Sequence, residues 1–265
     1  MANQASEHKN LIREEFTRQA DAFAASPTIK NPDRIALLVD AVNPGPTTRV
    51  LEIATGPGHI ALAFAPRCRE VVGIDLTEAP LKIAERMRAE RGITNARFIQ
   101  GDVEGRLPFE EGEFDAAACR FSFHHFQKPA AVAREMARVC RIGGRVVVED
   151  IGASEHPERA AYHNRFEVLR DTSHTRFIPL SELIIMIAAA GLEVLSVRTD
   201  DIPNPVERWL ATSYTPEDKA AEVRTMIERD IREDLSGTDS RRINGELCFT
   251  HRSAIIVARK LGPRA

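Results

Sequence analysis

The sequence predicts an α/β fold in which a doubly wound, seven-stranded sheet carries helices on both faces. From residue 49 onward, short apolar segments alternate with helical ones, which is the pattern of parallel strands joined by crossover helices. A glycine-rich turn with Gly56 and Gly58 follows the first of these strands, and the next two strands end in Asp75 and Asp102. These features predict a ligand site at the carboxyl ends of the strands.

The N-terminal segment is expected to form two helices before the sheet begins. Apolar residues recur at helical spacing over 7–24, where Ser6 can act as the N-cap. Asn31 and Pro32 provide an N-cap and a first-turn proline for the second helix. The break at 43–46, Asn-Pro-Gly-Pro, then separates this helix from the first strand.

Strand and helix patterns alternate through the rest of the chain, with two exceptions. The segments 152–178 and 201–244 depart from the alternation, and the second contains an amphipathic helix from Thr215 to Leu235. Insertions after late strands are expected to build a substrate cover. The predicted strands are 49–54, 70–75, 96–100, 114–119, 145–150, 192–199 and 246–258. The predicted helices are 58–65, 78–91, 129–141 and 181–190, with Thr77 and Ser181 as N-caps and Gly92, Gly143-Gly144 and Gly191 as ends.

Composition favours one domain spanning 1–265 and excludes several classes of protein. With a net charge of −3, the chain has no electrostatic footprint for nucleic acid or an anionic membrane. The four cysteines lack C-x-x-C spacing, so neither a zinc cage nor a redox pair is indicated, and three of them, in apolar or helical contexts, are expected to be buried thiols. The polar N-terminus and the lack of a long apolar run predict a cytoplasmic protein without membrane insertion.

The glycine turn fits two kinds of cofactor. As G-x-G-x-x-A it suits the pyrophosphate of a dinucleotide, and as E-x-A-x-G-x-G, from Glu52 to Gly58, it suits a sulfonium nucleoside. Asp75 can accept ribose hydroxyls in either case. Asp102 discriminates, because an acid at this strand end can accept the amino group of an adenine. A dinucleotide oxidoreductase is further disfavoured because neither of the two tyrosines begins Y-x-x-x-K.

These motifs together resemble those of the class I S-adenosylmethionine-dependent methyltransferases, and within them the ubiquinone/menaquinone-biosynthesis-like small-molecule group. The resemblance rests on VLEIATGPGHIA, VVGIDLT, FIQGDVEGRLPFEEGEFDAAACRFSFHHF and EMARVCRIGGRVVVED, and it covers roughly residues 10–150 well. It implies a Rossmann-like sheet whose last strand is antiparallel. It also implies a core over 46–150 and N-terminal helices, within 1–45, that cover the site.

The resemblance implies S-adenosylmethionine as the cofactor and assigns its contacts. The glycine turn would wrap the methionine part and Asp75 would hold the ribose. Leu76 would stack on the adenine, and Asp102 and Val103 would bind its edge. Arg120 would lie beside the sulfonium through its backbone. The full set of expected cofactor-binding residues is Glu52, Ala54, Thr55, Gly56, Gly58, Asp75, Leu76, Asp102, Val103 and Arg120.

The chemistry of such a site requires little from the protein beyond alignment. The cofactor supplies the activated methyl group, so the protein aligns a nucleophile and excludes water. Histidines 124 and 125 are the candidate bases for an acceptor that carries a proton, although alignment alone is the favoured mechanism. No metal is expected, because the histidines lack ligand spacing along the chain.

The predicted function is methyl transfer to oxygen, carbon or nitrogen of a small-molecule acceptor. The candidate acceptor contacts are Phe23, Asp150, His174 and Arg176. The alternative is an S-adenosylmethionine-binding sensor or assembly protein without transfer activity, which turnover of the cofactor would distinguish. The chain is expected to act as a monomer or homodimer.

Overall fold

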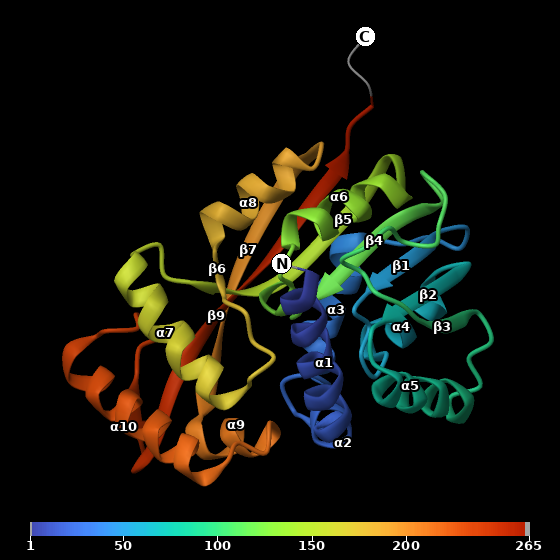
Figure 1. Cartoon of the computed structure of the whole chain (residues 1–265). Coiled ribbons are helices and arrows are strands. Elements are labelled where there is room, and N and C mark those ends of the chain that lie inside the picture. Colours follow the sequence, from blue (N-terminus) through green and yellow to red (C-terminus); the bar gives the residue numbers. More distant parts are fainter. Residues whose placement is uncertain (1, 263–265) are drawn as a thin grey trace.

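The computed structural model describes residues 2–262. The chain forms one mixed sheet with helices on both faces (Figure 1). Seven strands form a continuous path in the order β3-β2-β1-β4-β5-β9-β7, which agrees with the predicted sheet. Two short strands extend it, because β6 pairs with β5 and β8 pairs with β9. The strands are β1 (Arg49–Ile53), β2 (Glu70–Asp75), β3 (Ala96–Gln100), β4 (Phe114–Arg120), β5 (Cys140–Ala153), β6 (Ile178–Pro179), β7 (Leu192–Pro205), β8 (Arg241–Ile243) and β9 (Glu246–Lys260).

Strand directions locate the expected ligand site. Strands β1 to β5 are parallel, whereas β9 runs antiparallel to both β5 and β7. The strand order reverses at β1, which has β2 on one side and β4 on the other. Loops that leave the carboxyl ends of β1 and β4 turn to opposite faces at such a point, and a crevice opens between them.

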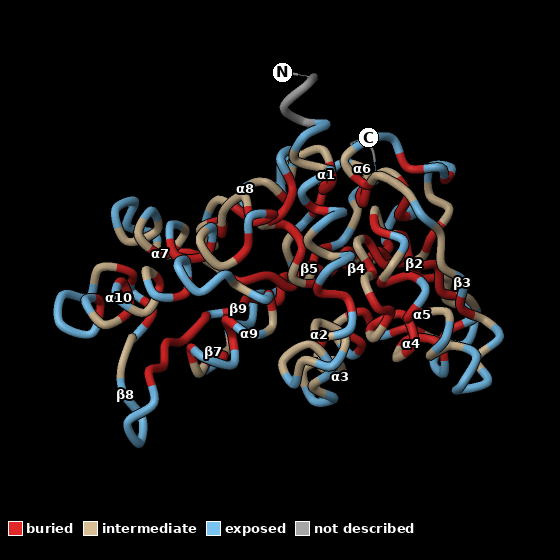
Figure 2. The backbone as a smooth tube through the Cα atoms, turned by 60° about the horizontal axis from the view of Figure 1, so that its bottom comes forward, coloured by how far each residue is buried: buried red, intermediate tan, exposed pale blue. Residues whose placement is uncertain are grey.

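Two apolar layers enclose the sheet, and its central strands are buried along most of their length (Figure 2). Val50 and Leu51 are adjacent in β1 and fully buried, but they belong to opposite layers. Helices α3 and α4 pack on one face and α6 and α8 on the other. The helices are α1 (Ala2–Arg18), α2 (Ala20–Ala25), α3 (Pro32–Val42), α4 (His59–Phe64), α5 (Glu78–Glu90), α6 (Pro129–Val139), α7 (Pro157–Arg170), α8 (Leu180–Ala189), α9 (Val206–Thr212) and α10 (Glu217–Glu233).

A separate apolar cluster forms around the late helices. Phe166 of α7, Trp209 of α9 and Ile227 of α10 pack with Phe249 of β9. These helices gather around one end of β7 and β9, beside the N-terminal helix α1 (Figure 1). The two segments that depart from the alternation therefore meet in space. They form a side wall next to the N-terminal helices.

Several element boundaries differ from the sequence predictions. The helix predicted over 7–24 is divided at Gln19, where φ is −97° and ψ is 5°. Ser181 is not an N-cap, because α8 starts at Leu180 and the Ser181 hydroxyl instead donates to Glu155 at 2.6 Å. Thr77 does hold the N-cap position of α5, although its hydroxyl has no partner in the described part of the chain.

The Gly143-Gly144 pair was predicted to end a helix, and this prediction is wrong. Helix α6 ends at Val139, and the glycines lie inside β5, where its register with β4 shifts. Gly143 has a φ of +76°, and a Cβ on Gly144 would lie 2.5 Å from the carbonyl oxygen of Asp115. The pair therefore permits an irregularity of the strand that other residues would block.

The predicted N-cap at Asn31 and the predicted burial of the cysteines are confirmed. Asn31 caps α3, because its side-chain oxygen accepts the N–H groups of Asp33 and Arg34 at 3.0 and 3.1 Å. All four cysteines are buried and unpaired. No helix in the described residues is long and apolar enough to cross a membrane.

Gly58 provides a test of the packing below the glycine turn. It has a φ of +76°, and an added Cβ would lie 2.8 Å from both Ala84 and Phe98. Gly92 has a similar φ of +63° but nothing within 4 Å of such a Cβ. Urea unfolding should show that Gly92→Ala lowers the free energy of unfolding by about 1–2 kcal/mol, because alanine is strained in the left-handed backbone conformation. Gly58→Ala should lose about 1–3 kcal/mol more through overpacking, and equal losses would contradict this account.

Candidate active site

A cavity of about 880 Å³ lies at the carboxyl ends of β1 to β4. Its wall contains nine of the ten residues expected to bind the cofactor, and Gly58 is the exception. The N-terminal helices contribute Lys9, Ile12, Phe16 and Phe23 to the same wall. The expected residues that line it are Glu52, Ala54, Thr55, Gly56, Asp75, Leu76, Asp102, Val103 and Arg120.

The Asp75 carboxylate holds the glycine turn in place. One of its oxygens accepts the Gly56 N–H at 2.8 Å and the other accepts the Thr77 N–H at 2.9 Å. Ala54, Gly56 and Gly58 all have positive φ, so the turn presents its backbone to the cavity. Burial raises the pKa of Asp75. The same carboxylate thus orders the turn and remains at the cavity wall, where ribose hydroxyls can share its remaining lone pairs.

Glu52 lies under the turn and is almost fully buried. One of its oxygens accepts the Thr55 hydroxyl at 2.5 Å and the Ala61 N–H at 2.8 Å, which joins β1 to the start of α4. Burial raises the pKa of Glu52 to about 8. The folded protein therefore holds a proton on this carboxyl group at neutral pH.

Asp102 connects the third strand to the N-terminal helix. Its carboxylate accepts the Glu104 N–H at 3.0 Å and forms an ion pair with Lys9 of α1 at 2.5 Å. Leu76 and Val103 line the cavity nearby. The side chain expected to bind an adenine amino group thus also holds α1 over the cavity.

Arg120 has a structural role in addition to its expected place beside the cofactor. Its buried guanidinium donates to Glu149 at 2.8 Å and to the Ile29 carbonyl oxygen at 2.8 Å. Arg34 of α3 donates to the same Glu149 carboxylate at 2.7 Å. These bonds attach the segment after α2 to the ends of β4 and β5, so the N-terminal wall of the cavity is anchored to the sheet.

A second cavity, of about 1030 Å³, adjoins the first. The two cavities have a common wall, formed by Phe16, Phe23, Ile29, Phe121 and His125. The second cavity reaches the late helices and is also lined by His124, His174, Phe177, Trp209 and His251. A molecule in the second cavity would therefore lie directly across this wall from one in the first.

The adjacent histidines 124 and 125 differ in chemistry. Nδ1 of His124 lies 2.6 Å from Asp150, which also accepts the His124 backbone N–H at 3.1 Å. The carboxylate fixes the tautomer with the proton on Nδ1 and leaves Nε2 as an acceptor. Nδ1 of His125 instead lies 3.0 Å from the Ser173 carbonyl oxygen, and burial lowers the pKa of His125 to about 4. His125 is therefore a weak base at neutral pH.

Of the four residues predicted to contact the acceptor, two line the second cavity and two line neither cavity. Phe23 and His174 line the second cavity, where Nε2 of His174 is 2.9 Å from the Asn164 side chain. Asp150 lines neither cavity, and its carboxylate instead bonds to His124 and accepts the Ile151 N–H at 2.7 Å. Arg176 was predicted to contact the acceptor, but it pairs with Glu182 at 2.9 Å and lines neither cavity.

Two features of the site were not predicted from the sequence. Lys9 lies in a predicted cover helix, but its partner Asp102 is 93 positions away. The buried residues His163, Glu167 and His251 lie together, although the sequence predicts no metal-ligand grouping. His163 and Glu167 have the i, i+4 spacing of one helix face, but a helix over 157–170 was not predicted.

The raised pKa of Glu52 predicts a pH-dependent stability. A carboxyl group with a pKa near 4.5 in the unfolded chain and about 8 in the fold binds more protons when folded. Its contribution to the free energy of unfolding is therefore complete below about pH 4.5 and is lost as the pH rises through 8. Urea unfolding between pH 5 and about 8 should show this loss in the wild type and a smaller one in Glu52→Gln. The exposed control Glu246→Gln should match the wild type, and identical profiles for all three would refute the assignment.

Comparison with known proteins agrees with this geometry. A family model described as a methyltransferase domain matches residues 51–148. The chain is 32% identical over 212 residues to the uncharacterized methyltransferase YcgJ of Bacillus subtilis (strain 168), which covers 80% of this chain and 83% of that protein. The crystal structure of YcgJ has a TM-score of 0.82 and 31% identity, and it covers 87% of this chain and 99% of that chain.

Two further similarities bear on the family. The chain is 30% identical over 188 residues to the ubiquinone biosynthesis O-methyltransferase of Paracidovorax citrulli (strain AAC00-1), over 69% of this chain and 78% of that protein. A geranyl diphosphate methyltransferase in complex with SAM shares the fold, with a TM-score of 0.63 at 18% identity over 86% of this chain and 85% of that chain. With its glycine turn, acidic strand ends and close similarity to YcgJ, the chain belongs to the class I S-adenosylmethionine-dependent methyltransferases.

Proposed function

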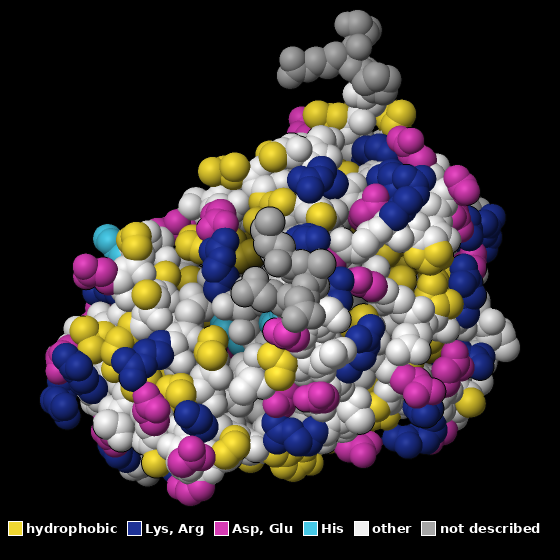
Figure 3. Space-filling view, in the orientation of Figure 1, with side chains coloured by type: hydrophobic (Ala, Val, Ile, Leu, Met, Phe, Trp, Pro, Cys, Tyr) yellow, Lys and Arg dark blue, Asp and Glu magenta, His cyan; other side chains and the backbone are white. Residues whose placement is uncertain are grey.

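We propose that this methyltransferase acts on a small-molecule acceptor held in the second cavity, and that the acceptor's attacking atom is a hydroxyl oxygen. The two adjacent cavities support this proposal, because aromatic side chains together with a few polar ones line them, as is typical of sites for small molecules. The surface charge gives no support to a nucleic-acid substrate, since acidic and basic side chains are interspersed on the face shown in Figure 3.

The arrangement suggests a division of the space between cofactor and acceptor. In this proposal S-adenosylmethionine occupies the inner cavity, with its ribose at Asp75 and its adenine at Asp102. The acceptor enters from the side of the late helices and meets the cofactor at the shared wall of Phe16, Phe23, Phe121 and His125. Alignment of the two molecules and exclusion of water supply most of the rate enhancement.

The observation that carries the choice of a hydroxyl is the His124–Asp150 pair. A carboxylate that holds the Nδ1 proton leaves Nε2 of His124 free to accept a proton from the attacking atom. The side chain of His124 lines the acceptor cavity but not the inner one. A carbon nucleophile that is already ionised would not need such a base. The Paracidovorax relative is an O-methyltransferase, which is consistent with an oxygen acceptor.

A calorimetric titration tests the cofactor assignment. S-adenosylmethionine and S-adenosylhomocysteine should both bind the wild type, and NAD should not. Asp75→Asn and Asp102→Asn should each weaken binding about 10- to 150-fold, because a hydrogen bond to a charged group contributes about 1.5–3 kcal/mol. The matched control Asp40→Asn, on the surface pair with Arg67, should bind as the wild type does. Binding of NAD with higher affinity than S-adenosylmethionine would overturn the assignment.

A second experiment separates the base from alignment and from a sensor without activity. Formation of S-adenosylhomocysteine is measured with a panel of phenols and hydroquinones, and the acceptor that turns over is kept for the variants. His124→Asn should lower kcat by about 10²–10⁴-fold with the cofactor affinity unchanged. His125→Asn should retain far more of the turnover, because burial lowers the pKa of His125 to about 4 and makes it a weak base.

Each alternative predicts a distinct result in this experiment. If alignment alone suffices, His124→Asn retains most of the turnover and the proposed base is wrong. If no acceptor in the panel or in a cell extract supports turnover while S-adenosylmethionine still binds, the chain acts as a sensor.

A further inference from the structure

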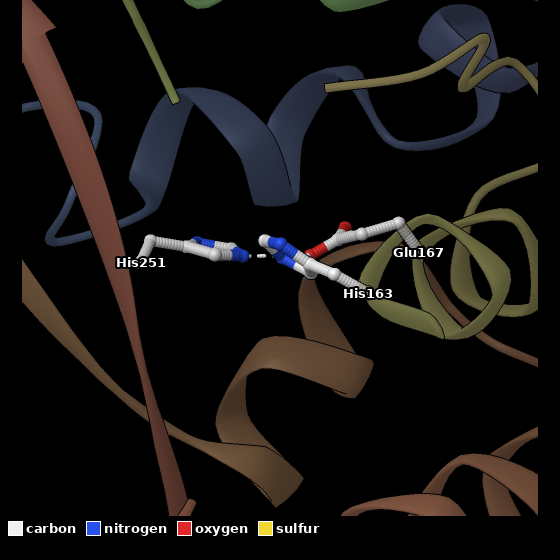
Figure 4. A group of neighbouring side chains, drawn as sticks. All are labelled: His163, Glu167 and His251. Atoms are coloured by element: carbon white, nitrogen blue, oxygen red, sulfur yellow. Dashed lines mark hydrogen bonds and ion pairs between the residues drawn. The ribbon is translucent and has the colours of Figure 1, made fainter. Parts of the chain in front are cut away.

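Three buried side chains with metal-binding atoms meet at the far wall of the acceptor cavity. His163 and Glu167 come from α7 and His251 from β9, and all three point toward one another (Figure 4). Their ligand atoms lie within 4.8 Å of one another. Nε2 of His251 is 2.6 Å from a Glu167 oxygen, and Nε2 of His163 is 3.5 Å from the same oxygen. Within the described residues they are the one group of this kind.

One ring nitrogen of His163 lacks a hydrogen bond in this arrangement of the described residues. His163 is 1% exposed, and its Nε2 atom has no hydrogen-bond partner among the described residues. A buried polar atom without a partner costs about 1–3 kcal/mol, and such atoms are rare in folded proteins. The atom faces the Glu167 carboxylate, which is also 1% exposed and already bound by His251. An ion placed between the three groups would give the His163 nitrogen a partner and would add to the positive charge that Arg170, 3.9 Å from the Glu167 carboxylate, already supplies.

We propose that His163, Glu167 and His251 bind a divalent first-row transition-metal ion of the zinc class. Two imidazole nitrogens and one carboxylate are ligands suited to such ions, and three protein ligands leave further coordination positions open. On binding through Nε2, the His251 ring must carry its proton on Nδ1, so the Asn204 amide nitrogen, 3.1 Å away, has to give up this contact and keep its bond to the Ile202 carbonyl oxygen at 2.8 Å. The sequence predicts no metal because these ligands lie on two elements far apart in the chain.

The position of the ion indicates what it would hold. Glu167 and His251 line the acceptor cavity. The Phe177 ring lies between this group and the His124–Asp150 pair, with centroid distances of 4.9 Å to His163 and 4.8 Å to His124. The ion therefore lies on the opposite side of Phe177 from the base. If the proposed function holds, an oxygen atom of the acceptor would fill an open position and anchor the end of the acceptor remote from the methyl group.

Direct metal binding tests the site without any assay of methyl transfer. Protein without an affinity tag is freed of metal with a chelator and titrated with Co²⁺, whose d–d absorption reports nitrogen and oxygen ligands. We expect about one ion per chain, displaced by Zn²⁺ and without thiolate-to-cobalt absorption. Zn²⁺ should also raise the melting temperature of the wild type, because a ligand that binds only the folded state stabilises it.

Two variants and one control locate the ion. His163→Gln and Glu167→Gln should each weaken Co²⁺ binding by more than about 100-fold, since even outer partners of metal ligands contribute about 10–100-fold. His156→Gln removes an exposed histidine next to α7 and should bind like the wild type. Because Nε2 of His163 has no partner, His163→Gln forfeits no hydrogen bond from that atom and is expected to fold, which circular dichroism checks.

The outcomes separate this proposal from the proposed function. Absence of Co²⁺ and Zn²⁺ binding to the wild type would overturn the site, as would binding that both variants retain. Either result leaves the cofactor titration and the His124 experiment intact. Conversely, a failed methyl-transfer assay with one bound ion per chain would leave the metal site standing.

Discussion

The contact between Asp75 and the glycine turn is the constraint on which the site depends. The carboxylate at the end of β2 accepts two backbone N–H groups, one of them from Gly56 in the turn that follows β1. Those donors would otherwise lack partners at the switch point of the sheet, where the backbone runs with positive φ. Glu52 supports the same turn from below through Thr55 and Ala61. The strand ends, the turn and the helix after it are thereby fixed as one rigid unit.

The parts of the molecule that lie over this unit come from both ends of the chain. Helix α1 is held by the Lys9–Asp102 ion pair, and the segment after α2 is held by Arg120. On the other side, α7, α9 and α10 share an apolar cluster with β9. The second cavity lies between these two walls, so its shape depends on contacts made far from the sheet core.

The histidines around the second cavity have separate chemical environments. Nδ1 of His124 lies against the Asp150 carboxylate, whereas Nδ1 of His125 lies against the Ser173 carbonyl oxygen and burial lowers the pKa of His125 to about 4. Behind Phe177, Glu167 lies between His163 and His251. The ring of Phe177 contacts both His124, the proposed base, and His163 of the proposed metal site. If both proposals hold, a single cavity combines acid–base chemistry at one end with ligation at the other.

Local patterns in the sequence by themselves determined four features: the glycine turn, the acidic strand ends, the alternation of strands and helices, and the N-cap at Asn31. These are short-range features whose physics is contained in a few neighbouring residues. Tertiary structure alone decided that Gly143-Gly144 lies within a strand, that Arg176 turns away to Glu182, and that Asp150 serves His124. It also brought Lys9 to Asp102 and His251 to Glu167, across 93 and 84 positions. Contacts over such separations depend on how whole elements pack, and no local periodicity records them.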